Sequence, residues 1–526
     1  MKNQTKPKTK PRTIITTDLE CDDMNSLIHL CLFLNEVDLD GVVYTSSQYH
    51  FNGDGVHTLG EVTPNYRCHG EAAYKTHRGY PRPDPEARNL KSYRPIEEGW
   101  IESLWENEYA EAYPNLIKHD PDFPSPERLL SITKYGNFAF EGDVREETEG
   151  SKLIKEAILD DDDRTLYLQS WGGANTIVRA LMSIAEEYKE TDQWDEIYKK
   201  VCSKVRILGI FNGVGQDNSF ADHAVNLYPD IVTMHADFGY GGFMAAINAQ
   251  ADVIDMFRSD WLKENIKFGY GPLMSKYGLF GDGTHYEGEP DVFQYGKQLS
   301  LNWGYDSIPN FTFNKYDHLG EGDSSTYVLL FDVGLRGLEK GNYGTLLGRV
   351  FENNKRPEEG YNFFTGKSGN PNRFIRGYQE EWAARAEWCI KPYDECNHPP
   401  VVQVVNGNIS AAPGQTVLLE GSASDPDGDS LSSYWFVYRE ASIYSGTASD
   451  LRVWEPVKMS TRFTVPADAK SGDYFNIVLE VQDDAKKPIT RYGQVIVEVV
   501  ESENGSESDE DLTFSMASLM ESPKEE

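Results

Sequence analysis

Short runs of β-branched and apolar residues alternate with helical patterns along most of the chain. The runs that predict strands are TIITT at 13–17, LDGVVYT at 39–45, TLYLQ at 165–169 and KVRILGIF at 204–211. After the first run, apolar side chains recur at helical spacing at Met24, Leu27, Ile28, Cys31 and Leu34. Because strands that alternate with helices form parallel sheets, we expect an α/β domain over residues 13–397, with a mostly parallel sheet and flanking helices.

The pattern changes at the NHPP segment, 397–400, where two prolines prevent a helix from continuing. Short alternating strands follow over residues 398–500, and their number and spacing favour an all-β sandwich of the immunoglobulin type. Within it, DPDGD at 425–429 predicts a turn, with a second calcium site as the alternative. The basic segment 1–12 and the acidic, low-complexity tail 501–526 are expected to be disordered.

Composition and charge exclude several classes of protein. At 526 residues, with 39% hydrophobic and 12% aromatic side chains, the chain can build more than one core. The formal net charge of −35 repels a phosphate backbone, so nucleic acid is not an expected partner. No run of 18 apolar residues occurs, which argues against a membrane-spanning helix. The basic opening leads into no apolar stretch, so a signal peptide is expected to be absent or already removed.

The six cysteines show no paired CxxC spacing, and zinc or redox chemistry is therefore not expected. Cys389 and Cys396 bracket a short polar stretch, CIKPYDEC. A small disulfide loop in an oxidising compartment and a pair of free thiols are equally compatible with this spacing.

The most informative stretch for chemistry is TDLECDD, which follows the first predicted strand. Four acids fall within it: Asp18, Glu20, Asp22 and Asp23. Like charges at this density need compensation, and the crevice beyond the carboxyl ends of parallel strands is where ligands bind. A hard cation held by oxygen ligands meets both conditions. Helix capping by Asp22 and Asp23 is the alternative, and it accounts for only two of the acids.

This motif resembles that of the inosine–uridine nucleoside hydrolase superfamily, whose first strand ends in Asp-x-Asp-x-x-x-Asp-Asp. Asp18, Asp22 and Asp23 match the last three acids, whereas Thr16 stands where the first acid is usual. The resemblance implies that Asp18 and Asp23 ligate calcium. It also implies that Asp22 binds sugar hydroxyls.

Two later segments extend the resemblance. QSWGGANTIVRAL at 169–181 is similar to the turn that presents a backbone carbonyl to the metal, which here would belong to Asn175. GEGDSSTYVLLFDVGL at 320–335 places Asp323 where the family has its C-terminal calcium-binding Asp. Alone, each segment is also typical of an ordinary helix start. Together with SSQYHFNGDG and NHPPVV, they are similar to the cellulose-binding Sde182-type, nucleoside-hydrolase-like family, over nearly the whole chain up to about Val500.

The sequence departs from true nucleoside hydrolases at the expected leaving-group acid, because Gly322 stands where those enzymes often have a histidine. His50 is the candidate general acid instead, since a histidine with its ordinary pKa of about 6.5 exchanges protons near neutrality. A packed rim residue is the alternative. The candidate substrate-binding residues are Asp22, Gln48, Trp171, Asp217 and Asn218. Trp171 is expected to stack on a sugar, and an ordinary polar turn is the alternative for the last two.

The sequence therefore predicts a Ca²⁺-dependent hydrolase of glycosidic bonds that acts on a carbohydrate or glycoside. Asp18 would accept the proton of the attacking water, next to a metal that positions water and sugar hydroxyls. A non-catalytic carbohydrate-binding (cellulose-binding) protein on the same fold and a nucleoside N-ribohydrolase are the alternatives. A secreted or periplasmic location is expected, and a homo-oligomer is left open.

Overall fold

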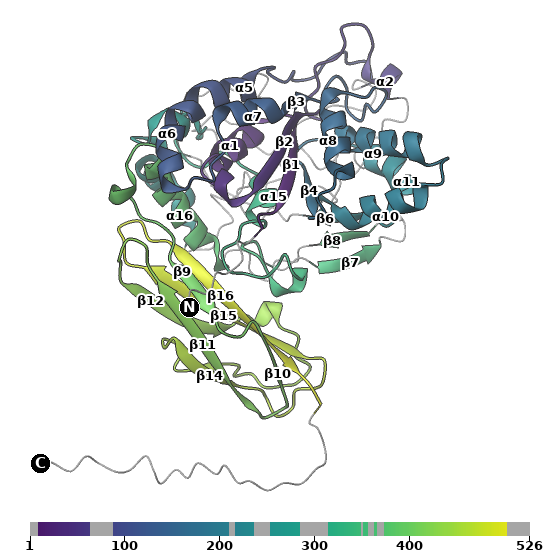
Figure 1. The fold of residues 1–526 in the computed structure, drawn as a ribbon. Coiled ribbons are helices and arrows are strands. Elements are labelled where there is room, and N and C mark those ends of the chain that lie inside the picture. Colours follow the sequence, from purple (N-terminus) through teal and green to yellow (C-terminus); the bar gives the residue numbers. More distant parts are fainter. Residues whose placement is uncertain are drawn as a thin grey trace, which may run out of the picture.

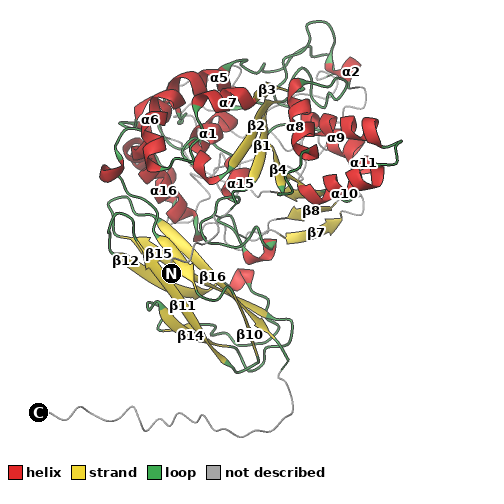
Figure 2. Ribbon diagram, viewed as in Figure 1, coloured by secondary structure: helices red, strands yellow, loops and turns green. Residues whose placement is uncertain are grey.

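The computed structural model describes residues 9–63, 88–209, 216–235, 253–283, 314–348, 351–355, 362–365 and 373–501. Residues 1–8 of the basic N-terminal segment and the acidic tail from 502 onward lie outside this part. Figure 1 shows an α/β domain and, packed against it, a β-sandwich. Figure 2 shows that the helices belong to the first of these domains almost entirely.

Eight strands form the sheet of the α/β domain within the described residues, in the order β3-β2-β1-β4-β5-β6-β8-β7. They are β1 (Arg12–Thr17), β2 (Asp38–Tyr44), β3 (Thr133–Tyr135), β4 (Leu166–Ser170), β5 (Val205–Gly209), β6 (Val232–His235), β7 (Phe351–Lys355) and β8 (Asn362–Thr365). All neighbours are parallel except β7 and β8, which confirms the predicted mostly parallel sheet. The strand order changes direction between β1 and β4. A crevice beyond the carboxyl ends of these two strands is where such sheets bind ligands.

Helices cover both faces of the sheet. Their bounds are α1 (Cys21–Leu30), α2 (Leu59–Val62), α5 (Trp100–Ser103), α6 (Ala110–His119), α7 (Pro126–Ile132), α8 (Glu149–Leu159), α9 (Asn175–Tyr188), α10 (Trp194–Lys204), α11 (Val225–Leu227), α13 (Ser259–Leu262), α14 (Gly271–Lys276), α15 (Ser324–Val328) and α16 (Ile375–Trp388). Alternate side chains of the strands point to opposite faces: Ile15 belongs to the core cluster that includes side chains of α1, α6 and α16, whereas Ile14 belongs to the cluster that includes side chains of α8 and α9. No helix in the described part is long and apolar enough to cross a membrane.

The predicted helix after β1 is confirmed, but it is shorter than its apolar pattern. The helix α1 ends at Leu30, and Leu34 begins a 3₁₀ turn. The backbone tightens at this point, because Leu32 donates to His29 and Phe33 donates to Leu30, three residues back in each case. Leu34 is nevertheless buried in the core, as the pattern predicts.

The C-terminal part is a sandwich of two four-stranded sheets in the described residues, with strand orders β10-β16-β15-β12 and β13-β14-β11-β9. The strands are β9 (Val401–Val404), β10 (Asn408–Ala411), β11 (Thr416–Ser424), β12 (Leu431–Val437), β13 (Val453–Trp454), β14 (Ser460–Thr464), β15 (Tyr474–Asp483) and β16 (Thr490–Val499). Their inward side chains, among them Leu419, Trp435 and Ile477, form a core of their own. The predicted β-sandwich is confirmed.

The sandwich also shares packing with the α/β domain. Phe436 and Tyr492 belong to the same apolar cluster as Phe374, which precedes α16. At the centre of this interface, Arg491 of β16 donates to both carboxylate oxygens of Glu381 at 2.6 and 2.7 Å. Burial raises the pKa of Glu381, but the positive charges of Arg491 and the neighbouring Arg385 outweigh it and lower that pKa to about 2. The two domains are therefore joined by buried contacts as well as by the linker.

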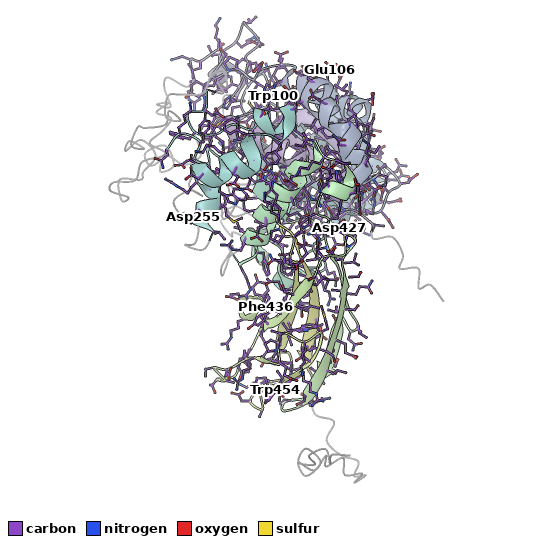
Figure 3. The ribbon with its side chains drawn as sticks, turned by 90° about the vertical axis from the view of Figure 1, so that its left-hand side faces the viewer. Trp100, Glu106, Asp255, Asp427, Phe436 and Trp454 are labelled. Carbon is purple, nitrogen blue, oxygen red and sulfur yellow. The ribbon has the colours of Figure 1, made fainter. Side chains whose placement is uncertain are left out.

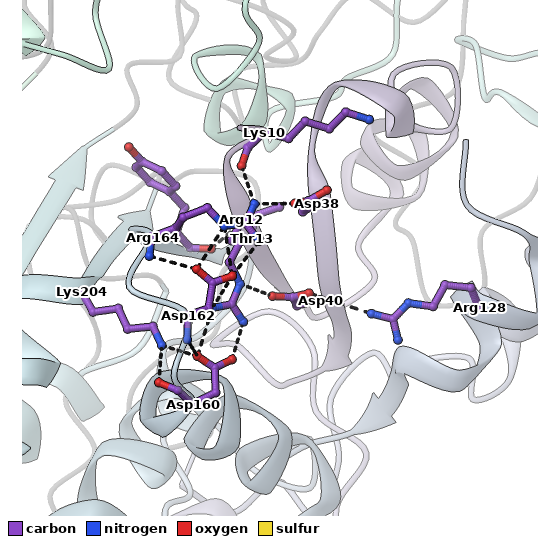
Figure 4. A network of polar contacts seen from close by, with 11 residues as sticks. Lys10, Arg12, Thr13, Asp38, Asp40, Arg128, Asp160, Asp162, Arg164 and Lys204 are labelled. Carbon is purple, nitrogen blue, oxygen red and sulfur yellow. Dashed lines mark hydrogen bonds and ion pairs between the residues drawn. The ribbon is translucent and has the colours of Figure 1, made fainter. Parts of the chain in front are cut away.

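The amino ends of the central strands carry a network of paired charges (Figure 4). Arg12 of β1 donates to Asp40 and to Asp160, each at 2.7 Å. Lys204 lies 2.5 Å from Asp160. Burial raises the pKa of Asp160, but the hydrogen bonds from Arg12 and Lys204 lower it to about 2. The acids shown at this edge of the sheet therefore have basic side chains of the protein as partners.

A pair of histidines connects the end of α6 to the linker. Nδ1 of His119 lies 2.9 Å from Nε2 of His398, and Nε2 of His119 lies 3.0 Å from the Lys391 carbonyl oxygen. His398 lies 3.0 Å from the carboxylate of Asp427 in the sandwich. Burial lowers the pKa of His119 to about 4, although the Lys391 carbonyl and Asp427 act to raise it.

We expect the free energy of unfolding to fall between about pH 6.5 and pH 4 because of His119. In this window the unfolded chain binds a proton that the folded protein excludes, so stability rises with pH, by at most about 1.4 kcal/mol per pH unit from one group. His119→Asn should flatten the pH dependence of the urea midpoint. Ile117→Ala, on an exposed part of the same helix, should leave the slope unchanged. A wild-type slope in the His119 variant would contradict this assignment.

Candidate functional site

The acids of the TDLECDD segment gather because the chain turns sharply between β1 and α1. Leu19 has a φ of 57°, in the left-handed region that residues other than glycine rarely adopt. Its N–H donates to Thr17 Oγ1 at 3.0 Å, and this hydroxyl donates to Asp23 Oδ1 at 2.5 Å. The Leu19 side chain is buried in the core of the domain. The turn therefore holds Asp23 near the end of β1, where the negative charge of Asp18 acts to raise the pKa of Asp23.

Asp323 joins this group from a distant part of the sequence. It stands immediately before α15, which packs against α1, and the N–H of Ser324 donates to Ser26 Oγ of α1 at 3.1 Å. As a result, carboxylate oxygens of Asp22, Asp23 and Asp323 all lie within 4.8 Å of one another. The structure thus brings together acids that the sequence separates by almost the whole α/β domain.

Three of the acids are buried with little compensation for their charge. Asp18 is 0% exposed, and Asp23 and Asp323 are each 1% exposed. Burial raises the pKa of Asp18 to about 6, with His50 acting to lower it and Glu20 to raise it. Burial and repulsion between the acids raise the pKa values of Asp23 and Asp323 well above their usual range. Within the described residues, neither oxygen of Asp18 nor Oδ1 of Asp323 accepts a hydrogen bond of ordinary geometry.

A hard cation fits this arrangement. Buried acceptors without donors are costly, and several carboxylates in one dry site cannot all be charged unless a positive charge joins them. Oxygen ligands favour calcium or magnesium over zinc. The network at the opposite edge of the sheet (Figure 4) shows the contrast, since its acids have basic partners. The identity of the ion stays a prediction.

The WGGANT turn packs directly against the acidic turn. A Cβ atom on Gly172 would lie 2.8 Å from the side chain of Asp18, and one on Gly173 would lie 2.3 Å from Oδ2 of Asp217. Any larger residue at these positions would push the acids away. The two glycines therefore allow the turn after β4 to lie close to Asp18 and Asp217.

Asn175, the predicted carbonyl ligand, is the first residue of α9. Its side-chain amide donates to Ser46 Oγ at 3.0 Å and to the Asn137 carbonyl at 2.7 Å, and its backbone N–H donates to Asp217 at 3.1 Å. These bonds fix the start of the helix beside the acidic turn. Its role as a metal ligand stays a prediction.

His50 lies next to the acidic cluster and has a defined tautomer when neutral. Its Nδ1 is 2.7 Å from the carbonyl oxygen of Arg94, and since a carbonyl only accepts, Nδ1 carries the proton. Nε2, 3.9 Å from Glu20, is then an acceptor. Burial and the charge of Arg94 lower the pKa of His50, with Glu20 and Asp18 acting to raise it. This arrangement favours accepting a proton over the predicted role of general acid.

Trp171 does not lie at an open rim, contrary to the expectation that it stacks on a sugar. It is 0% exposed, and its Nε1 donates to Thr326 Oγ1 of α15 at 2.7 Å. Its ring packs near Tyr327 of the same helix. The position at a strand end is as predicted, but α15 covers the ring, and Trp171 supports the site from within the core.

The other predicted substrate residues lie in the segments that follow β2 and β5. Gln48 is 6% exposed, and its N–H donates to the Gln216 carbonyl at 3.3 Å. Asp217 is buried, and its Oδ1 accepts from the N–H and the hydroxyl of Ser219 at 2.9 and 2.6 Å. Asp217 therefore anchors its turn, which was the alternative considered for it. Asn218 is partly exposed and lines a cavity of about 250 Å³.

Two buried residues near the cluster had no predicted role. Glu321 and His29, both 0% exposed, pair at 2.7 Å between Glu321 Oε2 and His29 Nδ1. Glu321 also accepts from Ser324 Oγ at 2.8 Å, so the pair fixes α1 and α15 behind the acids. Glu321 is an acid two residues before Asp323 in the GEGD motif, which is the one signal in the sequence that pointed to it.

Comparisons with known proteins show the family to which the chain belongs. A family model described as the nucleoside hydrolase-like domain of cellulose-binding Sde182 matches residues 12–350, and one described as the C-terminal domain of cellulose-binding protein Sde0182 matches residues 416–499. No curated protein matches the sequence significantly.

Among solved structures, one shares the fold of the whole chain. It is a nucleoside hydrolase-related hypothetical protein from Saccharophagus degradans that is associated with carbohydrate metabolism. The two sequences are 24% identical, and the match covers 93% of this chain and 100% of the Saccharophagus chain. The TM-score of 0.64 shows a common fold. A second solved structure, that of the fibronectin(III)-like modules of Clostridium thermocellum CbhA, is 15% identical over 22% of this chain and 53% of its own. Its TM-score of 0.15 supports no inference.

Proposed function

Because the chain belongs to the family of cellulose-binding Sde182 proteins with a nucleoside hydrolase-like domain, we propose that it is a calcium-dependent hydrolase of glycosidic bonds in a carbohydrate or glycoside. The observation that carries the proposal is the buried group of acids, in which both oxygens of Asp18 and Oδ1 of Asp323 accept no hydrogen bond of ordinary geometry from the part of the chain that the structure describes. The description of the family as cellulose-binding supports a carbohydrate ligand. A cellulose-like ligand also favours a secreted or periplasmic location, since such polymers lie outside the cell.

Asp18, Asp23 and Asp323, with the backbone carbonyl of Asn175, would hold the calcium ion. When bound, such an ion polarises a water molecule and orients sugar hydroxyls. The carboxylate of Asp22, 8% exposed, would accept hydrogen bonds from these hydroxyls.

Asp18 would take the proton of the attacking water. Nε2 of His50 would accept a second hydrogen bond on the same side, because its proton is held at Nδ1 by the Arg94 carbonyl. The remaining negative charge would stabilise a sugar that becomes positive as the glycosidic bond breaks.

A second candidate is a non-catalytic carbohydrate-binding protein, and the tautomer of His50 favours it. With the proton at Nδ1 directed to Arg94, His50 has none at Nε2 to give to a leaving group. Gly322 stands where nucleoside hydrolases often have their acid. A substrate whose leaving group needs no protonation would therefore be hydrolysed more readily than a free nucleoside.

Turnover tests separate these functions. In the presence of calcium, wild type should hydrolyse aryl glycosides with good leaving groups faster than cello-oligosaccharides, and nucleosides slowest. Asp18→Asn should lower kcat by about a hundredfold or more, since it removes the base and one proposed calcium ligand but keeps the shape of the side chain. Asp162→Asn, in the charge network at the other edge of the sheet, is the matched control and should keep full activity. Sugar binding without turnover of any substrate would favour the non-catalytic candidate.

A further inference from the structure

The β-sandwich has a cleft of its own, between the edge strands β12 and β13 of its two sheets. The cleft has a volume of about 490 Å³ and is lined by residues 434–437 and 451–456. Figure 3 shows Trp454 near the end of the sandwich that is remote from the α/β domain, and Phe436 closer to that domain. The acidic cluster lies at the end of β1 in the other domain, so the two sites are separate.

The cleft exposes two large aromatic side chains. Trp454 is 58% exposed and Tyr434 is 49% exposed. Single exposed apolar residues are common, but two exposed aromatic side chains that line one cleft are a feature of binding sites. Tyrosine and tryptophan suit ligands that have both apolar faces and hydroxyl groups, because each ring carries one polar atom.

Hydrogen bonds fix the Trp454 side chain and the backbone next to Tyr434. Nε1 of Trp454 donates to Thr464 Oγ1 at 3.3 Å, and the Trp454 carbonyl accepts from the hydroxyl of Thr461. On the other side, the N–H of Trp435, next to Tyr434, donates to the Pro456 carbonyl at 2.7 Å. The two strands are thus joined across the cleft, and its aromatic walls need little ordering when a ligand binds.

The charged residues at the rim balance one another. Arg452 lies 3.1 Å from Asp450, and Lys458 lies 2.5 Å from Glu455. Each positive side chain therefore has a negative neighbour, and the rim attracts neither anions nor cations strongly. This pattern fits an uncharged ligand, and its charged groups can accept or donate hydrogen bonds to hydroxyls.

We infer that this cleft binds an uncharged glucan chain, with Trp454 and Tyr434 packed on sugar faces, independently of the acidic cluster. The inference rests on the carbohydrate ligand of the proposed function. It adds a second carbohydrate site, which would retain the protein on a polysaccharide while the acidic cluster acts.

Binding of the full chain to cellulose tests the inference. Retention on microcrystalline cellulose and retardation in gels containing soluble β-glucan are measured in EDTA, so that no divalent ion contributes. Trp454→Ala should weaken binding by about tenfold or more, and Tyr434→Ala should weaken it too. Leu418→Ala, at an apolar position of the sandwich that is 47% exposed and outside the cleft, should bind like wild type. Melting temperatures should stay unchanged, since both rings are exposed.

The outcomes separate this inference from the proposed function. If wild type hydrolyses no glycoside but Trp454→Ala still loses cellulose binding, the proposed function fails and the cleft stands. If Asp23→Ala loses turnover but keeps cellulose binding, the two sites are independent as inferred. The inference is overturned if Trp454→Ala and Tyr434→Ala bind cellulose and β-glucan as wild type does, or if wild type binds neither.

Discussion

Asp23→Ala is expected to abolish the calcium-dependent rise in the melting temperature of the protein. In wild type, an ion that binds only the folded state adds about 2.7 kcal/mol to the free energy of unfolding at a hundredfold excess over its Kd. The variant loses an acid whose oxygens lie within 4.8 Å of those of Asp22 and Asp323. Without this ligand, added calcium should leave the melting temperature unchanged.

The same variant should behave in the opposite way without calcium. Asp23 is buried, and repulsion from Asp323, Asp18 and Asp22 adds to the effect of burial in raising its pKa. Its removal relieves this repulsion, so in EDTA the variant should melt at or above the wild-type temperature. A reversal of order between EDTA and calcium is the signature of a cation site.

Asp22→Asn tests how the roles are divided within the cluster: Asp22 oxygens lie close to those of Asp23 and Asp323, but we propose that Asp22 binds the sugar. This variant should keep most of the calcium-dependent stability and lose sugar binding or turnover. Titration calorimetry with calcium on wild type and both variants checks the affinities directly. Wild type that binds no divalent cation would falsify the site assignment.

Arg491→Ala is expected to destabilise the protein by about 3 kcal/mol or more, which is the usual cost of removing one partner of a buried ion pair. Glu381 is 2% exposed and, among the described residues, would keep Arg385 as its one basic partner. Because its pKa in the folded protein is about 2, the pair adds stability above the ordinary glutamate pKa and loses it as the pH falls towards 2. The difference between variant and wild type should therefore shrink in acid.

Urea unfolding at neutral and acidic pH measures this difference. Lys263→Ala breaks an exposed pair with Asp260, and as a control it should change stability by less than about 1 kcal/mol. An Arg491 variant as stable as wild type would show that the interface contributes little. The fragment 398–500, which has its own core, should then fold alone with unchanged stability.

The sequence predicted those features that depend on short stretches. The strands β1, β2 and β4 follow from short runs of β-branched and apolar residues that are mostly buried, and the sandwich follows from alternation after NHPP. The acidic site followed from charge density at the end of a strand. Asp323, however, was connected to it only through a resemblance, because no local pattern shows that α15 packs on α1.

The remaining features depend on contacts between distant segments. Trp171 was expected at an open rim, but Thr326 of α15 bonds to its ring nitrogen and covers it. The tautomer of His50 is set by the carbonyl of Arg94, which no motif in the sequence connects to it. In both cases the sequence predicted where the residue lies. The contact that determines what its side chain can do comes from a distant segment.

The left-handed turn at Leu19 has a consequence for how an ion binds. A left-handed conformation costs about 1–2 kcal/mol, whereas burying a leucine side chain contributes about 1.5–3 kcal/mol. Leu19 is 3% exposed, so the free energy gained by burial outweighs the cost of the left-handed conformation. Glycine at this position would relieve the backbone strain but lose the larger contribution of the buried side chain. The core thus fixes the turn before any ion arrives, and the site is preorganised. Ion binding should then show a small entropic penalty for ordering the loop, and its thermodynamics should be dominated by the release of water from the ion.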